Sequence, residues 1–318
     1  MTKLRDGHLT KYSVVGMKKR KTSENKTIGF EMLVDLYLLS LKNTKENTKA
    51  NYQNHLNQVA KHLTTEALKD VDVIDDDMLN LVERDLLANH SKNTTIQIMK
   101  TLKRVLAYAV KKGFMEASPF EYYEPLKKEE QLQYCPTDAE IARIKTEMEI
   151  GCTTLEQLRY RVAILLILDT GNRLNETLKL RWQDFNQDEK GYWKVTMDKT
   201  TTKNGKTYAK VVSNQVAEML NDLKDYADEN SIYIFETRNH KPIPSQNLQR
   251  YLGKLVKVIN PSISVHSLRR YKATAVYKET KDIVLVSRYI LHHSDVKTTE
   301  LYLNIQDTEA DDVLFNLF

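Results

Sequence analysis

The chain has 318 residues, of which 41% are hydrophobic and 29% are charged, a composition typical of a globular protein of about two domains. No run of about 18 apolar residues occurs, and the N-terminal residues lack the apolar segment of a secretory signal. The sequence therefore predicts neither a membrane span nor export. Cys135 and Cys152 lack metal-binding spacing and are expected to be reduced thiols of a cytoplasmic protein.

The net charge of +5 is concentrated at the N-terminus. Residues 1–26 hold eight basic and two acidic residues, so the rest of the chain is close to neutral. The arm includes the run Lys18, Lys19, Arg20 and Lys21. A basic arm on a near-neutral body is a common means of holding a polyanion such as DNA, although a solvated tail without a partner has the same composition.

Residues 27–120 are predicted to form a helical domain. Apolar residues recur three and four positions apart in the segments 30–41, 52–63, 78–86 and 99–110. Asp75 to Asp77 suit the start of the third helix, and Gly113 suits the end of the fourth. Amphipathic helices of this length can bury one small shared core.

Residues 121–133 are interpreted as a linker, because they contain Pro125 and a charged run but no apolar period. A second domain, residues 134–318, follows. It opens with a predicted capping box of Thr137 and Glu140, in which the two residues satisfy each other's backbone amides. Residues 162–168 are apolar on nearly every face and predict a buried helix.

The second domain also contains strand signals. The segments 193–197 and 208–212 flank Asn204-Gly205, a dipeptide that favours the tight turn of a β-hairpin. Helices are expected near residues 248–256, 266–279 and 282–291. The predicted fold class is therefore mainly α with a small β-sheet, comprising a helical domain followed by a mixed α+β domain.

Six residues of the second half share the chemistry of phosphate binding or nucleophilic attack. They are Arg173, Lys203, His266, Arg269, His293 and Tyr302. The first follows a glycine at the end of the buried helix, and the second stands beside the Asn-Gly turn. The His-x-x-Arg pair shares one helix face. The tyrosine follows the last histidine by nine residues, in HHSDVKTTELY.

Cleavage of a phosphodiester requires neutralisation of its charged oxygens, a nucleophile and an acid for the leaving alkoxide. Two arginines can clamp the non-bridging oxygens, and a phenol can attack. Each residue also has an ordinary interpretation. Arg173 alone is more simply an arginine of a surface turn, and Lys199 or Lys206 can be mistaken for Lys203. Arg270, beside Arg269, is expected to point away into solvent.

The order Arg, Lys, His-x-x-Arg, His, Tyr resembles that of the tyrosine recombinases, the family of phage integrases and Xer proteins. The segments NTKENTKANYQNHLNQV and KNTTIQIMKTLKRVLAYAVKKGFMEASP resemble the helical, SAM-like core-binding domain of integrases. The second domain resembles their catalytic domain. The resemblance therefore covers nearly the whole chain.

The resemblance implies a site-specific recombinase that clamps double-stranded DNA at paired half-sites. It would be a homotetramer on DNA and a monomer or weak dimer when free. Tyr302 would form a 3′-phosphotyrosyl link, with Lys203 as general acid. His266 would assist proton transfer, His293 would bind the phosphate, and Glu176 would support the site. No metal or other cofactor is implied.

The sequence departs from the family's pattern at two positions. Asn172 stands where Leu is usual, and His292 stands where Gly is usual. Whether His292 or His293 faces the phosphate is open, although the pattern favours His293. A second interpretation is a sequence-specific DNA-binding regulator on the same fold, without strand exchange. A third, a type IB topoisomerase, shares the chemistry but is less consistent with the chain length.

The tail, residues 304–318, is acidic and then apolar. Thr308 suits a helix start, and the apolar residues Val313, Leu314, Leu317 and Phe318 would share one face. Because so short a helix is unstable alone, it must pack on its own domain or, as the resemblance implies, on a neighbouring protomer.

Overall fold

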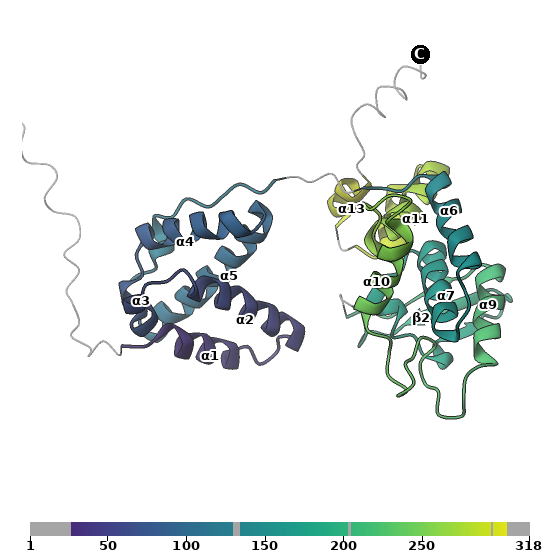
Figure 1. Ribbon diagram of the computed structural model, residues 1–318, viewed down its shortest axis with the longest axis horizontal. Coiled ribbons are helices and arrows are strands. Elements are labelled where there is room, and N and C mark those ends of the chain that lie inside the picture. Colours follow the sequence, from purple (N-terminus) through teal and green to yellow (C-terminus); the bar gives the residue numbers. More distant parts are fainter. Residues whose placement is uncertain (1–26, 130–133, 203–204, 294, 304–318) are drawn as a thin grey trace, which may run out of the picture. The chain divides into compact units, whose positions relative to one another are not determined.

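The computed structural model describes residues 27–129, 134–202, 205–293 and 295–303. The chain divides into two compact units, Met1–Glu130 and Gln131–Phe318, each with its own hydrophobic core (Figure 1). The basic arm and the C-terminal tail lie outside the described residues. The segment expected to be a linker is described as far as residue 129, and its boundaries remain a prediction.

The first unit is helical, as expected. Its elements are α1 (Phe30–Ser40), α2 (Glu46–Ala60), α3 (Thr65–Lys69), the 3₁₀ turn η1 (Val71–Val73), α4 (Asp76–Asn89), α5 (Lys92–Lys112) and the 3₁₀ turn η2 (Pro119–Glu121). Asp75 caps α4 through the amide of Met78, and Gly113 ends α5 in a left-handed conformation. Both predicted ends are confirmed. Helix α3 was not predicted, because it has too few residues to show a period.

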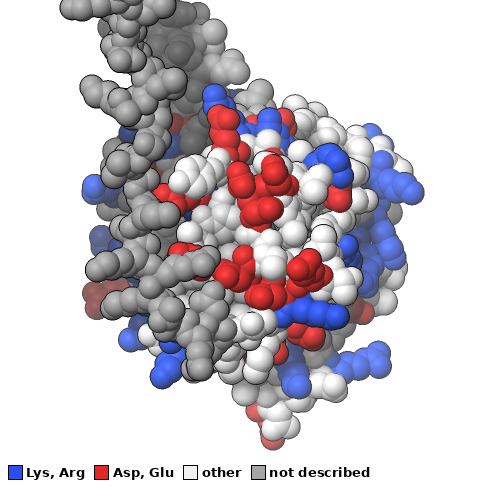
Figure 2. Space-filling model, turned by 90° about the vertical axis from the view of Figure 1, so that its left-hand side faces the viewer, with Lys and Arg blue, Asp and Glu red and all other residues white. Residues whose placement is uncertain are grey.

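Helix α5 runs through the centre of this unit and packs against α1, α2 and α4. Its buried face includes Leu102, Val105 and Leu106, which are fully shielded from solvent. Its exposed residues include Lys100, Lys103, Arg104 and Lys111. Lys103 and Arg104 follow Lys100 by three and four positions, and Lys111 follows Arg104 by seven, so the four residues form a basic stripe along the helix. Figure 2 shows one face of the molecule, where Asp and Glu side chains gather at the centre and many Lys and Arg side chains lie toward the right of the view.

The second unit is built around α7. Its helices are α6 (Asp138–Ile150), α7 (Leu155–Thr170), α8 (Leu174–Thr177), α9 (Asn214–Lys224), α10 (Ser245–Val256), α11 (Val265–Thr280), α12 (Ile283–Leu285), η4 (Val286–Leu291) and α13 (Val296–Leu303), with a 3₁₀ turn η3 (Trp182–Asp184). Helix α7 is buried on nearly every side and packs against α9 and α11. The predicted buried helix and the capping box of Thr137 and Glu140 are confirmed.

The sheet of the second unit has three antiparallel strands in the order β1 (Phe185–Gln187), β2 (Trp193–Met197) and β3 (Tyr208–Val211). Strands β2 and β3 form the predicted hairpin, with Met197 opposite Tyr208. In the connection, Gly205 has a φ of 67°, whereas Asn204 lies outside the described residues. Strand β1 was not predicted, because three residues carry no alternation.

Helices α10 and α11 lie where they were expected, but residues 282–291 differ from a regular helix. Only the α12 segment is α-helical, and η4 continues as a π-helix that ends at His292 with a φ of 48°. A π-helix inserts one extra residue per turn, which an apolar spacing pattern does not reveal. No helix in the described parts of the chain is both long and apolar enough to cross a membrane.

Helices α11 and α13 and the π-helix η4 enclose a small hydrophobic cluster separate from the main core. Its buried members are Ala273, Val286, Leu291 and Leu303. Tyr302 packs against this cluster, which we call the α13 cluster. The helix that carries the predicted nucleophile is therefore anchored outside the main core.

Candidate active site

Arg173 is placed by the sharp end of α7. Gly171 adopts a left-handed conformation with a φ of 66°, and a Cβ there would lie 3.0 Å from Cγ2 of Ile290. Glycine suits this position on both counts. Asn172 is fully buried, and the chain then enters α8 at Arg173. The Arg173 guanidinium donates to the Leu291 carbonyl at 3.3 Å.

Glu176 holds Arg173 from the next turn. Its Oε1 lies 3.1 Å from the guanidinium of Arg173, and its Oε2 accepts the backbone amide of the same residue. Only 2% of Glu176 is exposed, and Tyr208 on β3 donates its hydroxyl to Oε2 at 2.7 Å. Burial opposes ionisation, but this hydroxyl and the charge of Arg173 outweigh it and lower the pKa of Glu176. Its predicted supporting role thus has a physical basis.

Arg269 approaches from α11 and is 3% exposed. Its guanidinium donates to the carbonyl of Gly171 and, at 2.6 Å, to the carbonyl of Leu291. The same Leu291 oxygen therefore accepts from both Arg173 and Arg269. Two forked cations that converge on one oxygen are suited to an anionic group such as a phosphate.

The position of Arg270 contradicts the prediction. It is 2% exposed rather than solvated, its guanidinium carbon lies 4.3 Å from the centre of the Tyr302 ring, and it donates to the Tyr302 carbonyl. The prediction that Arg270 points into solvent is wrong because α13 packs on α11 and covers the side next to Arg269. The spacing of residues within α11 alone gives no sign of this second neighbour.

Tyr302 lies on α13 with its hydroxyl 3.2 Å from the backbone carbonyl of His266, to which it donates. Burial raises the pKa of Tyr302, and the charges of Arg269 and Arg270 oppose this shift only in part. The phenol therefore keeps its proton at neutral pH. The side chain of His266 is exposed at the start of α11, beside this hydrogen bond.

The two adjacent histidines face different partners. The His293 ring lies edge-on to Tyr302, with ring centres 5.6 Å apart, and its Nδ1 is 3.0 Å from the Thr299 hydroxyl. The His292 ring stacks on Tyr208, with ring centres 3.6 Å apart. Burial and neighbouring cations lower the pKa of both rings to about 4, so both are neutral at pH 7. The left-handed backbone of His292 explains why a glycine is usual there.

The structure thus brings together the side chains of five predicted residues and the backbone of a sixth. Arg173, Glu176, Arg269, His293 and Tyr302 converge, and His266 contributes its carbonyl. Lys203 lies outside the described residues, and the alternatives Lys199 and Lys206 are exposed.

Sequence reasoning missed other residues that contact this group, namely Tyr208, Lys210, Arg270 and Thr299. Some of them left a signal. Tyr208 and Lys210 alternate along β3 and therefore share one face of the strand. Thr299 stands three residues before Tyr302 on α13, so the two side chains lie on one side of that helix.

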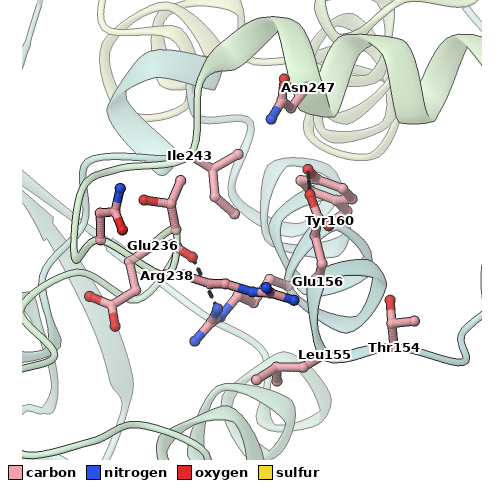
Figure 3. A pocket seen from close by; sticks show the side chains of 11 residues that line it. Thr154, Leu155, Glu156, Tyr160, Glu236, Arg238, Ile243 and Asn247 are labelled. Atoms are coloured by element: carbon pink, nitrogen blue, oxygen red, sulfur yellow. Dashed lines mark hydrogen bonds between the residues drawn. The ribbon is translucent and has the colours of Figure 1, made fainter.

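A cavity also lies apart from this site. A cavity of about 660 Å³ lies elsewhere, between the start of α7 and residues 236–247, where Arg159 donates to the Glu236 carbonyl at 3.0 Å (Figure 3). None of the predicted site residues lines it. Within the described ranges, no three metal-binding side chains gather at one point.

Two family models match the chain. Residues 137–309 match the phage integrase family, and residues 30–129 match the phage integrase SAM-like domain. The chain belongs to the phage integrase family. It is similar to a tyrosine recombinase of Thermosipho africanus, with 27% identity over 297 residues, 90% of this chain and 98% of the relative. It is also similar to the tyrosine recombinase XerC of Staphylococcus aureus, at 23% identity over 86% of this chain and 91% of that protein.

Solved integrase structures share the fold. A lambda integrase dimer bound to a COC′ core site has a TM-score of 0.70 at 18% identity, over 88% of this chain and 78% of that one. The Tn1549 transposon integrase bound to circular intermediate DNA has a TM-score of 0.71 at 15% identity, over 92% and 100%. The predicted fold class, a SAM-like helical domain with a mixed α+β catalytic domain, is confirmed. This family member is a tyrosine site-specific recombinase.

Proposed function

We propose that this recombinase cuts and rejoins DNA through a 3′-phosphotyrosyl link at Tyr302, with Arg173 and Arg269 bound to the scissile phosphate. The observation that carries the proposal is the shared Leu291 carbonyl, which accepts from both guanidinium groups. A non-bridging phosphate oxygen is an acceptor of the same kind but carries a full charge, so it binds the pair more strongly.

The chemical step begins with the Tyr302 hydroxyl, which is held on the His266 carbonyl. As its oxygen bonds to phosphorus, its proton passes to the His266 side chain or to water, and Arg269 stabilises the phenolate. The bond from phosphorus to the 5′ oxygen breaks, and Lys203 protonates that oxygen. Rejoining reverses these steps. The covalent link conserves the energy of the phosphodiester, so the reaction consumes no nucleotide.

His293 completes the phosphate site in this proposal. We assign its neutral ring the tautomer that accepts the Thr299 hydroxyl at Nδ1, 3.0 Å away, and carries the proton on Nε2. That N–H donates to a non-bridging oxygen. Glu176 orients Arg173, while His292, stacked on Tyr208, stays away from the phosphate.

The substrate in this proposal is double-stranded DNA with paired half-sites, on which four protomers assemble. Support comes from the solved relatives, which include a lambda integrase dimer on a core site and a lambda integrase tetramer on a Holliday junction. The basic arm, with Lys18 to Lys21, binds the DNA backbone. The free thiols of Cys135 and Cys152 fit a protein that works on DNA in the cytoplasm.

Covalent capture tests the proposal. The DNA segment that the protein protects on its own genome is made as a duplex with a nick near the cleavage site, so that the cut strand is lost. The wild-type protein should form an adduct that survives a denaturing gel and maps to the peptide containing Tyr302. Tyr302→Phe should bind the duplex within a few-fold and form no adduct. Specific binding without any wild-type adduct would leave a DNA-binding regulator and overturn the proposal.

A further inference from the structure

Lys210 is a buried lysine that the proposed reaction does not use. It lies on β3 and is 6% exposed. Its Nζ donates to the Thr170 carbonyl at 2.9 Å and to the Ile290 carbonyl at 2.6 Å. Both acceptors are backbone carbonyls rather than carboxylates.

These two carbonyls belong to the two segments that carry the site. Thr170 is the last residue of α7 and stands three residues before Arg173. Ile290 lies near the end of the π-helix and directly precedes Leu291, whose carbonyl accepts from both arginines. The Lys210 side chain therefore joins the end of α7, next to Arg173, to the end of the π-helix, next to the Leu291 carbonyl.

The charge of Lys210 is costly at this place. Burial and then the nearby Arg269 lower its pKa well below the usual value, and Arg173 and Lys272 add to the shift. A neutral donor can join two carbonyls without the desolvation that a buried ammonium requires. Beside two arginines, the protonated form of Lys210 is favoured when a phosphate anion binds, because the anion offsets the crowded positive charge.

We propose that Lys210 is a positioning residue: it sets the separation of the Gly171–Arg173 and Leu291–His293 segments, and thereby fits Arg173 and Arg269 to the scissile phosphate. The inference rests on the proposed function and extends it to a residue outside the predicted set. A purely structural lysine would change only the fraction of protein that is folded. A positioning lysine changes the rate at which folded protein reacts.

The experiment compares three variants on the nicked duplex in single-turnover covalent capture. Lys210→Met removes the two hydrogen bonds and the titratable group. Lys210→Arg keeps a positive charge and N–H donors for the two carbonyls. Lys194→Met is the matched control, because Lys194 is on the neighbouring strand β2 and pairs at 2.6 Å with Asp188, outside the site. For each variant, the amplitude reports the active fraction and the rate constant reports the reaction of active molecules.

We expect Lys210→Met to keep an amplitude near that of the wild type while its rate constant falls about 100-fold, the scale of a 1 Å misplacement. Half-site binding should stay within a few-fold. Lys210→Arg should recover part of the rate, and Lys194→Met should match the wild type. The loss should also shrink on a duplex in which a methyl group replaces one non-bridging oxygen, because less charge then has to be clamped.

A Lys210→Met protein with the wild-type rate constant, or with a reduced amplitude alone, would overturn the inference. So would an equal loss of rate on the phosphate and methylphosphonate duplexes, since arginine placement would then not be what Lys210 controls. If Lys210→Met does not fold, Lys210→Gln is judged by the same rate and amplitude. A wild-type protein that forms no adduct would instead overturn the proposed function itself.

Discussion

Arg270 holds Tyr302, the proposed nucleophile, at both its ring and its backbone. Its guanidinium lies over the Tyr302 ring and also donates to the Tyr302 carbonyl. A desolvated cation–π contact contributes up to about 2 kcal/mol, and the backbone bond adds to it. Loss of both contacts should let α13 shift, which places the phenol less well for attack.

We therefore expect Arg270→Met to lower the rate of covalent capture at least tenfold, the effect of about 1.4 kcal/mol on the barrier. Half-site binding should change little, because Arg270 is buried away from solvent. Arg288→Met, which removes an exposed arginine of the π-helix, is the control. Equal capture rates in the wild type and Arg270→Met would rule out this role.

His292 makes the stability of the second unit depend on pH. Its pKa is about 4 in the folded chain, mainly because of burial, against an ordinary value of 6.5 when unfolded. As the pH falls from about 6.5 to 4, the unfolded chain gains a proton that the folded chain does not, so acid favours unfolding in this window. Above it, the residue is neutral in both states and has no effect.

Replacement of His292 by Gly should therefore flatten the fall in melting temperature between pH 7 and pH 5. Glycine also suits the left-handed backbone at this position. The melting temperatures of the wild type and the variant are compared by near-ultraviolet circular dichroism at both pH values. An unchanged difference between the two pH values would show that the ring is not what responds to acid.

The candidate site was predictable where a residue's own neighbours in the sequence place it. Arg173 after Gly171, and His266 three residues before Arg269, follow from local geometry and from the family's order. Arg270 and Lys210 were not predictable in this way. Each is buried by an element distant in sequence, and no short pattern reports which element will cover a helix or strand.

Helices were predicted correctly where side chains cap the backbone groups at their ends, or where apolar residues recur over a long segment. The capping box of Thr137 and Glu140 and the left-handed end of α5 at Gly113 are local chemistry. Helix α7 is long and apolar enough to be recognised as buried. Helix α3 and strand β1 are too short for either signal, and the π-helix was missed because apolar spacing does not report an extra residue per turn.

The basic stripe on α5 is a candidate surface for contacts with DNA phosphates. Lys100 and Lys103 are exposed on a helix whose other faces are buried, so their loss should leave the fold intact. If they contact DNA phosphates, Lys100→Ala together with Lys103→Ala should weaken binding to all sequences alike. The slope of log affinity against log salt should fall by about one unit per lost contact.

This is measured by fluorescence anisotropy with a labelled duplex over a range of salt concentrations. Lys69→Ala, which removes an exposed lysine at the end of α3, serves as the control and should leave the slope unchanged. An unaltered slope in the double variant would mean that α5 does not carry the contact.

At the scale of the whole molecule, the tail is expected to link protomers. Residues 304–318 lie outside the described part of the chain, and their sequence of acidic and then apolar residues predicts an amphipathic helix. If this short helix packs on a neighbouring protomer, deletion of residues 309–318 should spare the binding of one protomer to a half-site. Cooperative occupancy of paired half-sites and recombination should both fall.

A gel-shift titration on single and paired half-sites distinguishes the two forms of packing. Full cooperativity in the truncated protein would contradict packing between protomers. A loss of single half-site binding and of melting temperature would instead indicate that the tail packs on its own domain.

Helix α13 is anchored in its own small cluster, Ala273, Val286, Leu291 and Leu303, rather than in the main core around α7. A segment held by few apolar contacts opens at a lower free energy than the whole domain unfolds. Substitutions in the α13 cluster can therefore change how often Tyr302 leaves its place beside the His266 carbonyl while the quantity of folded protein stays the same. In the proposed reaction, changes in this cluster thus give natural selection a means to alter the timing of DNA breakage without altering the lifetime of the folded enzyme.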